Sequence, residues 1–285
     1  MESALRHRLR NVDEQVWTQP MRDSITTAAQ RGSLFAPGPI RPEDLTETFR
    51  HLLHGKASVA AVSLDVEPPP LFLEEAAAAA NMAAARRREF ALGRYCAHQA
   101  MAQMGVTPVA VPLGVDRGPL WPRSVIGSIS HWENWCVAAV MATGEYRSFG
   151  IDGERRRTLP AGLLSEVATA SEHAWLESAD KAFEWDAALF SMKEAVYKAW
   201  APVTDLWLEF KDVEIAVELE ARTFCAEIRE ANRHHRETTE IHGQFAFEGD
   251  SVLAVAFLQN SPSGPGTATT ATRRLGDKSR NREVL

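Results

Sequence analysis

Residues 190–200 read FSMKEAVYKAW, a run of good helix formers with no Gly or Pro before Pro202. Glu194 and Lys198 are four residues apart and therefore share one face of the predicted helix. Lys193 lies about 100° around that helix from Glu194. One turn thus offers a carboxylate flanked by two ammonium groups, which suits an anionic, phosphate-bearing ligand. The alternative is a solvent-exposed Glu–Lys pair on an amphipathic helix.

Length and composition describe an ordinary globular chain. Its 285 residues allow one large domain or two moderate ones, and 45% hydrophobic residues provide material for a core. The net charge of −7 argues against nucleic-acid binding over the whole surface. The three cysteines, Cys96, Cys136 and Cys225, form no CxxC pair. We therefore expect buried reduced thiols rather than a disulfide framework or a zinc site.

Neither a signal peptide nor a membrane span is recognised. The start, MESALRHRLRNVDEQ, lacks an apolar core, and the longest apolar run, residues 135–142, is far below the roughly 20 residues that cross a bilayer. We expect a cytoplasmic protein with no nucleic-acid or membrane partner.

Composition divides the chain into four expected regions. Residues 1–33 form a polar N-terminal extension, 34–150 an N-terminal half, 151–260 a C-terminal half, and 261–285 a Ser/Pro/Gly/Thr-rich disordered tail. Three prolines predict a loop over residues 34–47. Strands are expected at 58–65, 135–141, 148–154, and within 210–219 and 239–258; helices are expected at 71–104, with a break near Asn81 or Gly93, and at 163–170, 171–178 and 185–201. This order predicts an α+β fold.

A second motif, IDGE, contains Asp152 and Glu154. In a strand, residues i and i+2 point to the same face, so the two carboxylates would lie side by side. Two convergent carboxylates suit Mg²⁺, which binds protein carboxylates, water and phosphate oxygens. The alternative is a hairpin turn, because Asp-Gly is also a common turn dipeptide.

A third motif, GSISH at residues 127–131, contains Ser128, Ser130 and His131. A Gly followed by small hydroxyl residues can present backbone amides and a hydroxyl to phosphate. His131 would donate to a phosphate, or would instead be a structural histidine.

A fourth motif is the basic cluster of Arg86, Arg87 and Arg94. Guanidinium groups match phosphate oxygens with two hydrogen bonds. The alternative is a solvated helix face. The chain has no GxxxxGK[ST], GxGxxG, HExxH or GxSxG motif, so any phosphate chemistry must use scattered basic residues and a metal.

The order GSISH, GIDGE and FSMKEAVYKAW resembles the 4′-phosphopantetheinyl transferase superfamily, and most closely its bacterial subgroup that serves siderophore, polyketide, nonribosomal peptide and lipid synthases. RRREFALGRYCAHQAM and GPLWP also match that subgroup, and the likeness covers roughly residues 58–258. It implies two pseudo-symmetric α+β halves with the active site between them. A monomer is then sufficient.

The resemblance implies an enzyme of the holo-[acyl-carrier-protein] synthase type. Such an enzyme transfers the 4′-phosphopantetheine moiety of coenzyme A to a serine of an acyl or peptidyl carrier protein and releases adenosine 3′,5′-bisphosphate. The implied ion is Mg²⁺, with Mn²⁺ as the alternative. The implied metal ligands are Asp152, Glu154 and Glu194, and the implied catalytic residues are Glu194, as general base, and Lys198.

The resemblance also implies contacts with coenzyme A from Arg86, Arg94, Ser128, His131, Lys193 and Lys198. Many relatives have a basic residue near the position of Leu113, and here Arg117 is the nearest replacement. An acidic carrier protein would need a local basic or apolar patch on this negative chain, and we expect it at residues 155–164. Two other functions remain open: a metal-dependent phosphohydrolase, and an inactive module that binds coenzyme A or a carrier protein.

Overall fold

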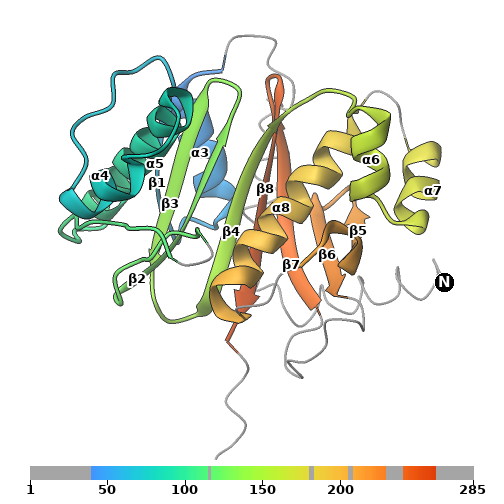
Figure 1. The fold of residues 1–285 in the computed structure, drawn as a ribbon. Helices are drawn as coiled ribbons and strands as arrows, with labels where there is room; N and C mark the ends of the chain where they lie inside the picture. The colour runs from blue at the N-terminus through green and yellow to red at the C-terminus, as the bar shows by residue number, and fades with distance from the viewer. Residues whose placement is uncertain (1–39, 115–116, 180–182, 205–207, 229–239, 261–285) are drawn as a thin grey trace, which may run out of the picture.

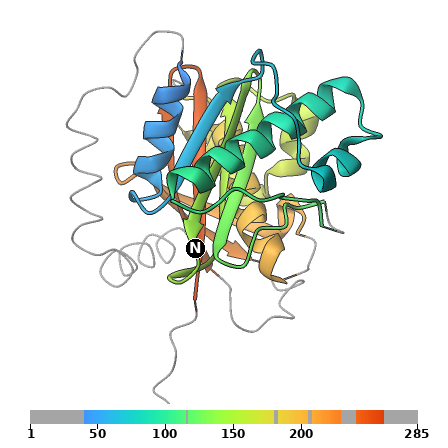
Figure 2. The ribbon, with the colours of Figure 1, turned by 90° about the vertical axis from the view of Figure 1, so that its left-hand side faces the viewer.

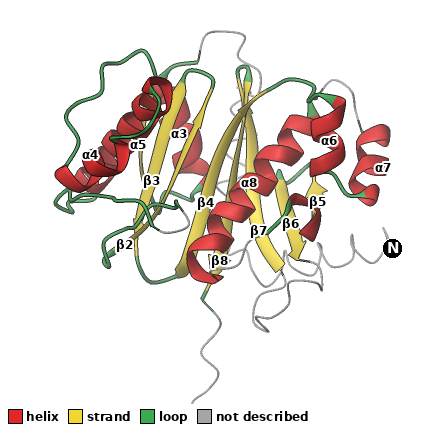
Figure 3. Ribbon diagram, in the orientation of Figure 1, coloured by secondary structure: helices red, strands yellow, loops and turns green. Residues whose placement is uncertain are grey.

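Two antiparallel sheets stand side by side, with helices against them (Figure 1). The computed structural model describes residues 40–114, 117–179, 183–204, 208–228 and 240–260. The expected N-terminal extension at 1–33 and tail at 261–285 lie outside these residues. Runs of helices and runs of strands follow one another along the chain, and both sheets are antiparallel, which confirms the predicted α+β class (Figure 3).

The first sheet has three strands in the order β1-β3-β2, and its helices are α3, α4 and α5. Their bounds are β1 Ser58–Ser63, β2 Val125–Trp132, β3 Trp135–Ala142, α3 Pro42–Leu52, α4 Leu73–Ala79 and α5 Ala84–Gln103. Val59 packs in one core cluster with residues of α3, whereas Ala60 packs in another with residues of α5. The two helices therefore cover opposite faces of this sheet (Figure 2).

The second sheet has five strands in the order β4-β8-β7-β6-β5. The strand bounds are β4 Tyr146–Arg155, β5 Val213–Glu218, β6 Thr223–Ile228, β7 Glu240–Glu248 and β8 Ser251–Gln259. The helices are α6 Ala161–Val167, α7 Ala170–Ser178, α8 Trp185–Thr204 and the 3₁₀ helix η1 Phe210–Asp212. Helix α8 lies across one face of this sheet (Figure 1).

The loop predicted at residues 34–47 is wrong for its second part, because α3 begins at Pro42. Proline is tolerated in the first turn of a helix, where its missing N–H leaves no bond unmade. The side chain of Asp44 accepts a hydrogen bond from the backbone N–H of Arg41, and Phe49 and Leu45 bury the apolar face of the helix. The prolines before residue 42 hid this helix in the sequence.

The helix expected at 71–104 is two helices, separated between Ala79 and Ala84 near the anticipated break at Asn81. Gly93 lies inside α5, where a Cβ atom would approach Ile129 to 3.1 Å. It therefore serves close packing rather than a break. Strands β2 and β6 had no counterpart among the predicted elements.

The two sheets share part of their core. One cluster contains Phe49 of α3, Val137 of β3, Phe149 of β4 and Val255 of β8. Packing thus crosses the expected boundary near residue 150, and the division into two halves at that residue stays a prediction. No helix in the described ranges is both long and apolar enough to cross a membrane.

Candidate active site

Strand β4 carries the two carboxylates of IDGE. It is continuous through this motif, with Asp152 opposite Ala254 and Glu154 opposite Val252 on β8. The hairpin alternative is therefore wrong. The residue between them is Gly153. A Cβ atom there would come within 2.5 Å of the ring of Trp132, so a larger residue would not fit.

Helix α8 lies unusually close to this strand. A Cβ atom at Gly150 would stand 2.0 Å from the carbonyl oxygen of Ala195, so only glycine permits the approach. Lys198 Nζ lies 2.6 Å from Asp152 Oδ1, and the two side chains are only 25% and 5% exposed. The alternative of a solvated Glu–Lys pair is therefore excluded for Lys198.

Strand β2 meets β4 through serine side chains. The hydroxyl of Ser128 accepts a hydrogen bond from the N–H of Ile151 at 3.0 Å, and that of Ser130 accepts one from Gly153 at 3.3 Å. Ser130 also donates to Asp152 Oδ1 at 2.9 Å and accepts from Lys198 at 3.3 Å. These bonds join the two sheets and tie Ser130 to the carboxylate site.

The position of Ser128 argues against its predicted contact with coenzyme A. It is 3% exposed, and its hydroxyl group binds the backbone of β4. Ser130, in the same motif, is just as buried, at 1% exposure, but it bonds to Asp152 and Lys198. Sequence spacing could not separate the two, because residues i and i+2 of a strand share a face.

The carboxylates form an electrostatically coupled group. Burial, followed by the charge of Asp152, raises the pKa of Glu154 to about 7. Burial also raises the pKa of Glu194; Lys198 opposes this shift and Asp152 adds to it. Asp152 Oδ2 is buried, and among the described residues it has no hydrogen-bond partner. The unsatisfied oxygen of Asp152, beside two further acidic side chains, is the kind of ligand that Mg²⁺ takes, although in the described structure the ligand atoms of the three carboxylates do not all lie within 4.8 Å of one another.

Arg86 and His131 come together beside this group. Arg86 Nη1 lies 2.6 Å from His131 Nε2 and 3.0 Å from Glu89 Oε2. Burial lowers the pKa of His131, Arg86 and Lys198 lower it further, and Glu89 opposes the shift. The imidazole is therefore neutral near pH 7, and the side chain of Arg86, 49% exposed, can reach a ligand.

Arg94 is almost completely buried, at 5% exposure. Its Nε donates to the carbonyl oxygen of Val111 at 2.8 Å, and its guanidinium group lies 4.1 Å from the ring centre of Phe90. Its Nη2 has no hydrogen-bond partner in the described part of the chain. Burial lowers the pKa of Arg94 to about 10. A buried, charged donor of this kind calls for an anionic partner.

Glu75 supports Arg94 and was not selected from the sequence. It is fully buried and accepts hydrogen bonds from the N–H groups of Phe72 and Val111. His98 Nε2 lies 2.9 Å from its carboxylate. Its charge favours the protonated form of Arg94. Glu75 thus positions the backbone that Arg94 binds.

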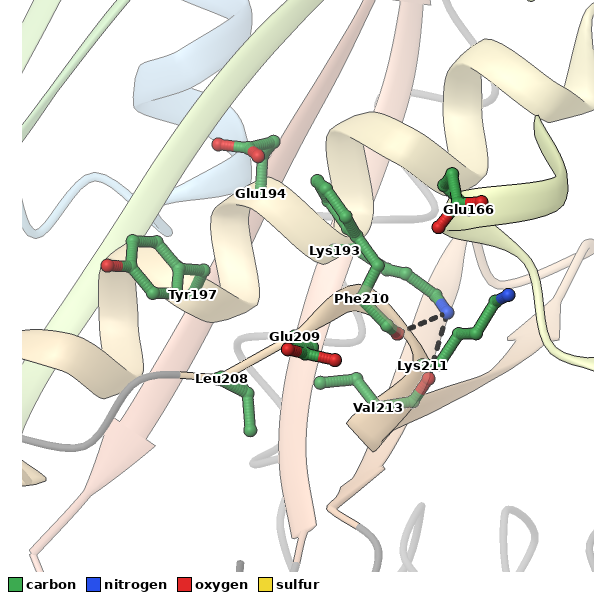
Figure 4. A pocket seen from close by; sticks show the side chains of 9 residues that line it. All are labelled: Glu166, Lys193, Glu194, Tyr197, Leu208, Glu209, Phe210, Lys211 and Val213. Atoms are coloured by element: carbon green, nitrogen blue, oxygen red, sulfur yellow. Dashed lines mark hydrogen bonds between the residues drawn. The ribbon is translucent and has the colours of Figure 1, made fainter. Parts of the chain in front are cut away.

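Lys193 points away from Glu194, toward η1 (Figure 4). Its ammonium group lies 2.7 Å from Glu172 and donates to the carbonyl oxygens of Val167, Phe210 and Val213. Its side chain is 1% exposed. The structure therefore argues against the predicted coenzyme A contact of Lys193, which is a buried structural ion pair.

A pocket of about 400 Å³ opens between α8 and η1 (Figure 4). Its lining is part apolar, from Tyr197, Leu208, Phe210 and Val213, and part charged, from Glu166, Lys193, Glu194, Glu209 and Lys211. Lys193 thus borders the pocket although its ammonium group is turned into the protein. The pocket thus adjoins the carboxylate group, and sequence reasoning did not foresee it.

Arg117 lies apart from these groups. It is exposed in the segment between α5 and β2, with a positive φ of 67°. Within the described ranges, it forms no side-chain hydrogen bond or ion pair with the other predicted site residues. Its role in coenzyme A binding stays a prediction.

Two family models match the chain, one before β4 and one that includes most of β4. The 4′-phosphopantetheinyl transferase N-terminal domain matches residues 74–141, and the 4′-phosphopantetheinyl transferase superfamily matches residues 148–256. The chain belongs to the 4′-phosphopantetheinyl transferase superfamily. Arg86, Arg94 and Ser130 lie in the first match, and Asp152, Glu154 and Glu194 lie in the second.

Three named 4′-phosphopantetheinyl transferases are similar to this superfamily member. Npt of Nocardia iowensis is 44% identical over 133 residues, which are 47% of this chain and 60% of Npt. Svp of Streptomyces mobaraensis is 40% identical over 143 residues, 49% of this chain and 58% of Svp. PptT of Mycobacterium tuberculosis is 38% identical over 134 residues, 47% of this chain and 59% of PptT. The aligned part therefore spans somewhat more than half the length of each relative.

Proposed function

We propose that this transferase moves the 4′-phosphopantetheine moiety of coenzyme A to a serine of an acyl or peptidyl carrier protein. The product is the holo carrier, so the reaction is that of a holo-[acyl-carrier-protein] synthase. One observation carries the proposal: Ser130 and Lys198 bring the carboxylates of β4 and α8 against the strand that bears His131. The groups proposed to bind anions and metal thus meet where β2 lies against β4 and α8, and we call this region the seam.

Coenzyme A is anionic, and the basic groups on the β2 side suit its phosphates. Arg94 offers a buried donor, Nη2, that lacks a protein partner among the described residues. Arg86 and His131 lie at a more exposed position and offer further donors. Charge-assisted bonds from guanidinium groups are the strongest that a phosphate receives from a protein.

Asp152, Glu154 and Glu194 would hold the divalent ion, Mg²⁺ or Mn²⁺. The ion, when bound, supplies charge stabilisation to pyrophosphate oxygens. Asp152 keeps Oδ2 available because its other oxygen is engaged by Lys198 and Ser130.

In the proposed step, the carrier serine oxygen forms a bond with the β-phosphorus of coenzyme A, and the bond to the leaving phosphate oxygen breaks. Glu194 accepts the serine proton, directly or through water, and burial raises the pKa of its carboxyl group, which makes the carboxylate a stronger base. Lys198 stabilises the charge that develops on adenosine 3′,5′-bisphosphate. Positioning and charge stabilisation dominate phosphoryl-type transfers, and these residues supply both.

The pocket beside Glu194 suits the pantetheine arm. That arm is uncharged and mostly apolar, with amide groups along it. Tyr197, Leu208 and Phe210 offer apolar contacts, and the pocket begins at the proposed base. An arm that enters here keeps the reacting phosphate beside the carboxylates.

One assay separates the proposal from its alternatives. The protein is incubated with coenzyme A, Mg²⁺ and an apo carrier protein, and the carrier is weighed by mass spectrometry. A gain of one phosphopantetheine supports transfer. Coenzyme A breakdown without carrier supports a phosphohydrolase, and binding without turnover supports an inactive module.

We also propose a monomeric, cytoplasmic enzyme. Both sides of the seam come from one chain, so a second copy is not needed to complete the site. Light scattering of the purified protein tests the monomer, and fractionation of cells tests the location.

A further inference from the structure

A second group of metal-binding side chains lies away from the seam, on β6 and β7. The ligand atoms of Cys225, Glu240 and His242 all lie within 4.8 Å of one another. Their neighbours Phe224, Ala226 and Ile241 pack in the core cluster beneath α8. Because side chains alternate along a strand, the three ligands lie on the opposite face of the sheet from α8.

Strand pairing brings the three residues together. Cys225 is directly opposite His242 in the β6–β7 ladder, and Glu240 precedes His242 by two residues on the same face. Glu227 is in turn directly opposite Glu240. Like charges at facing positions destabilise a sheet, so this pair places excess negative charge beside the sulfur and nitrogen ligands.

The donor set suits zinc rather than magnesium. Zn²⁺ binds thiolate, imidazole and carboxylate in a tetrahedral arrangement, and three protein ligands leave one position for water. Mg²⁺ prefers oxygen ligands and an octahedral arrangement. The site therefore differs in chemistry from the carboxylates of the seam.

Burial and exposure are also compatible with metal entry. Cys225 and His242 are half-buried and Glu240 is exposed, so none of the three is closed off in the core.

We propose that Cys225, Glu240 and His242 bind one Zn²⁺ ion that cross-links β6 and β7. From the spacing of the cysteines we expected no zinc site. That expectation considered cysteine pairs close in sequence, whereas these three ligands are brought together by strand pairing. The two strands are joined through residues 229–239, and β7 also pairs with β8. A cross-link here would tie β6, and with it the edge strand β5, to the central strand β7 of the five-stranded sheet.

Cobalt provides a direct test, because a thiolate–Co²⁺ bond gives a charge-transfer absorption in the near ultraviolet that oxygen ligands do not give. The full chain, reduced and stripped of metal, is titrated with Co²⁺ in a large excess of Mg²⁺, which occupies the oxygen-ligand site. We expect one Co²⁺ per chain with this absorption, and its loss when Zn²⁺ is added. Zn²⁺ should also raise the melting temperature. No thiolate absorption would overturn the proposal.

Four variants locate the ion. Cys225→Ser should abolish the absorption, and His242→Gln and Glu240→Gln should weaken Co²⁺ binding at least tenfold. Cys96→Ala removes a buried thiol on α5, not on β6 or β7, and should retain wild-type binding. Melting of the metal-free proteins establishes that each is folded, and the exposed Glu240 keeps the test valid if another variant fails to fold.

The sequence also contains His234 and His235 between the two strands, outside the described residues. A His234→Gln/His235→Gln variant should bind Co²⁺ as the wild type does. Loss of the ion in that variant, or an absorption that survives Cys225→Ser, would show that other residues hold the metal.

Discussion

Lys198 on α8 holds one carboxylate oxygen of Asp152 on β4 at 2.6 Å, and leaves the other oxygen buried without a hydrogen-bond partner in the described structure. The ammonium group thus fixes the orientation of the carboxylate. The remaining oxygen is available to an ion. The ion pair therefore prepares the proposed metal site before any metal binds.

Asp152→Ala and Glu154→Ala should each reduce transfer at least about 100-fold, because loss of a metal ligand removes several kcal/mol of charge stabilisation. Coenzyme A should still bind through the arginines. Turnover is measured by carrier mass and binding by calorimetry. Wild-type turnover of either variant at low Mg²⁺ would rule out the proposed ligands.

Glu154 should make the metal-free protein less stable as the pH rises. Its pKa is about 7 in the folded protein, against 4.5 for an isolated glutamate. The folded state therefore binds the proton more tightly, and its stability falls between about pH 4.5 and 7. Glu154→Gln should raise the melting temperature at pH 7.5 by about 2–5 °C and flatten the pH profile.

The matched control for this change is Glu67→Gln, because the side chain of Glu67 is 89% exposed. All proteins are measured in EDTA. An unchanged pH profile in Glu154→Gln would show that another group is responsible.

Arg94→Ala should weaken coenzyme A binding more than it slows the chemical step. Loss of a charge-assisted hydrogen bond of 1.5–3 kcal/mol corresponds to an increase in Kd of about 10- to 150-fold. Arg94→Lys keeps the charge but loses the fork, so it should restore only part of the affinity. Calorimetry of folded variants measures both. A wild-type Kd for Arg94→Ala would remove this residue from the site.

Lys193→Ala should lower the free energy of unfolding and leave coenzyme A binding unchanged. It leaves Glu172, which is 2% exposed, without its partner, and breaking a buried pair costs about 3–5 kcal/mol. Lys193→Met combined with Glu172→Gln should lose less, because no buried charge remains. Urea unfolding measures the difference. A loss of coenzyme A affinity at unchanged stability would restore the direct contact.

Fewer residues of the patch expected to dock the carrier, residues 155–164, are exposed in the structure than the sequence suggested. Arg155 and Arg157 are 51% and 56% exposed, and each lies 3.8 Å from Glu133. Arg156 instead bonds to Glu184 and to the carbonyl oxygen of Gly249, so it is structural. Leu159 is buried and Leu163 is 39% exposed.

Arg155→Ser/Arg157→Ser should therefore raise KM for an acidic carrier and weaken its salt dependence, with KM for coenzyme A unchanged. The control is Arg41→Ser/Arg50→Ser, at two exposed positions at or near α3. If both double variants behave alike, the carrier binds elsewhere.

Spacing in the sequence predicted which side chains share a face of β4 or of α8. It did not predict which of them contact the rest of the protein. The alternation of Asp152 and Glu154 and the four-residue step from Glu194 to Lys198 are local properties, and the structure retains both. Helical spacing also separates Lys193 from Lys198, but it does not say which face is buried. That choice depends on Glu172 and on the backbone of η1, which are distant in sequence.

The missed residues have the same cause. Glu75 acquires its role only because α4 packs near Val111, and Ser130 differs from Ser128 only in lying opposite Asp152. Helix α3 was missed for a local reason, because Pro37, Pro39 and Pro42 together resemble a loop, although Pro42 is the first residue of the helix. Family resemblance identified the motifs together, but it did not distinguish a ligand contact from a structural one.

The order of strands in the second sheet has a consequence for synthesis of the protein. Among the strands that the structure describes, β4, which carries the proposed metal-binding pair, forms a backbone ladder only with β8, and β8 also pairs with β7. A nascent chain that has not yet reached Ser251 therefore leaves β4 and β7 with open edges, which favour aggregation. The carboxylates that define the site are thus assembled late, and interrupted translation before residue 251 should yield an aggregation-prone chain rather than a partly active one.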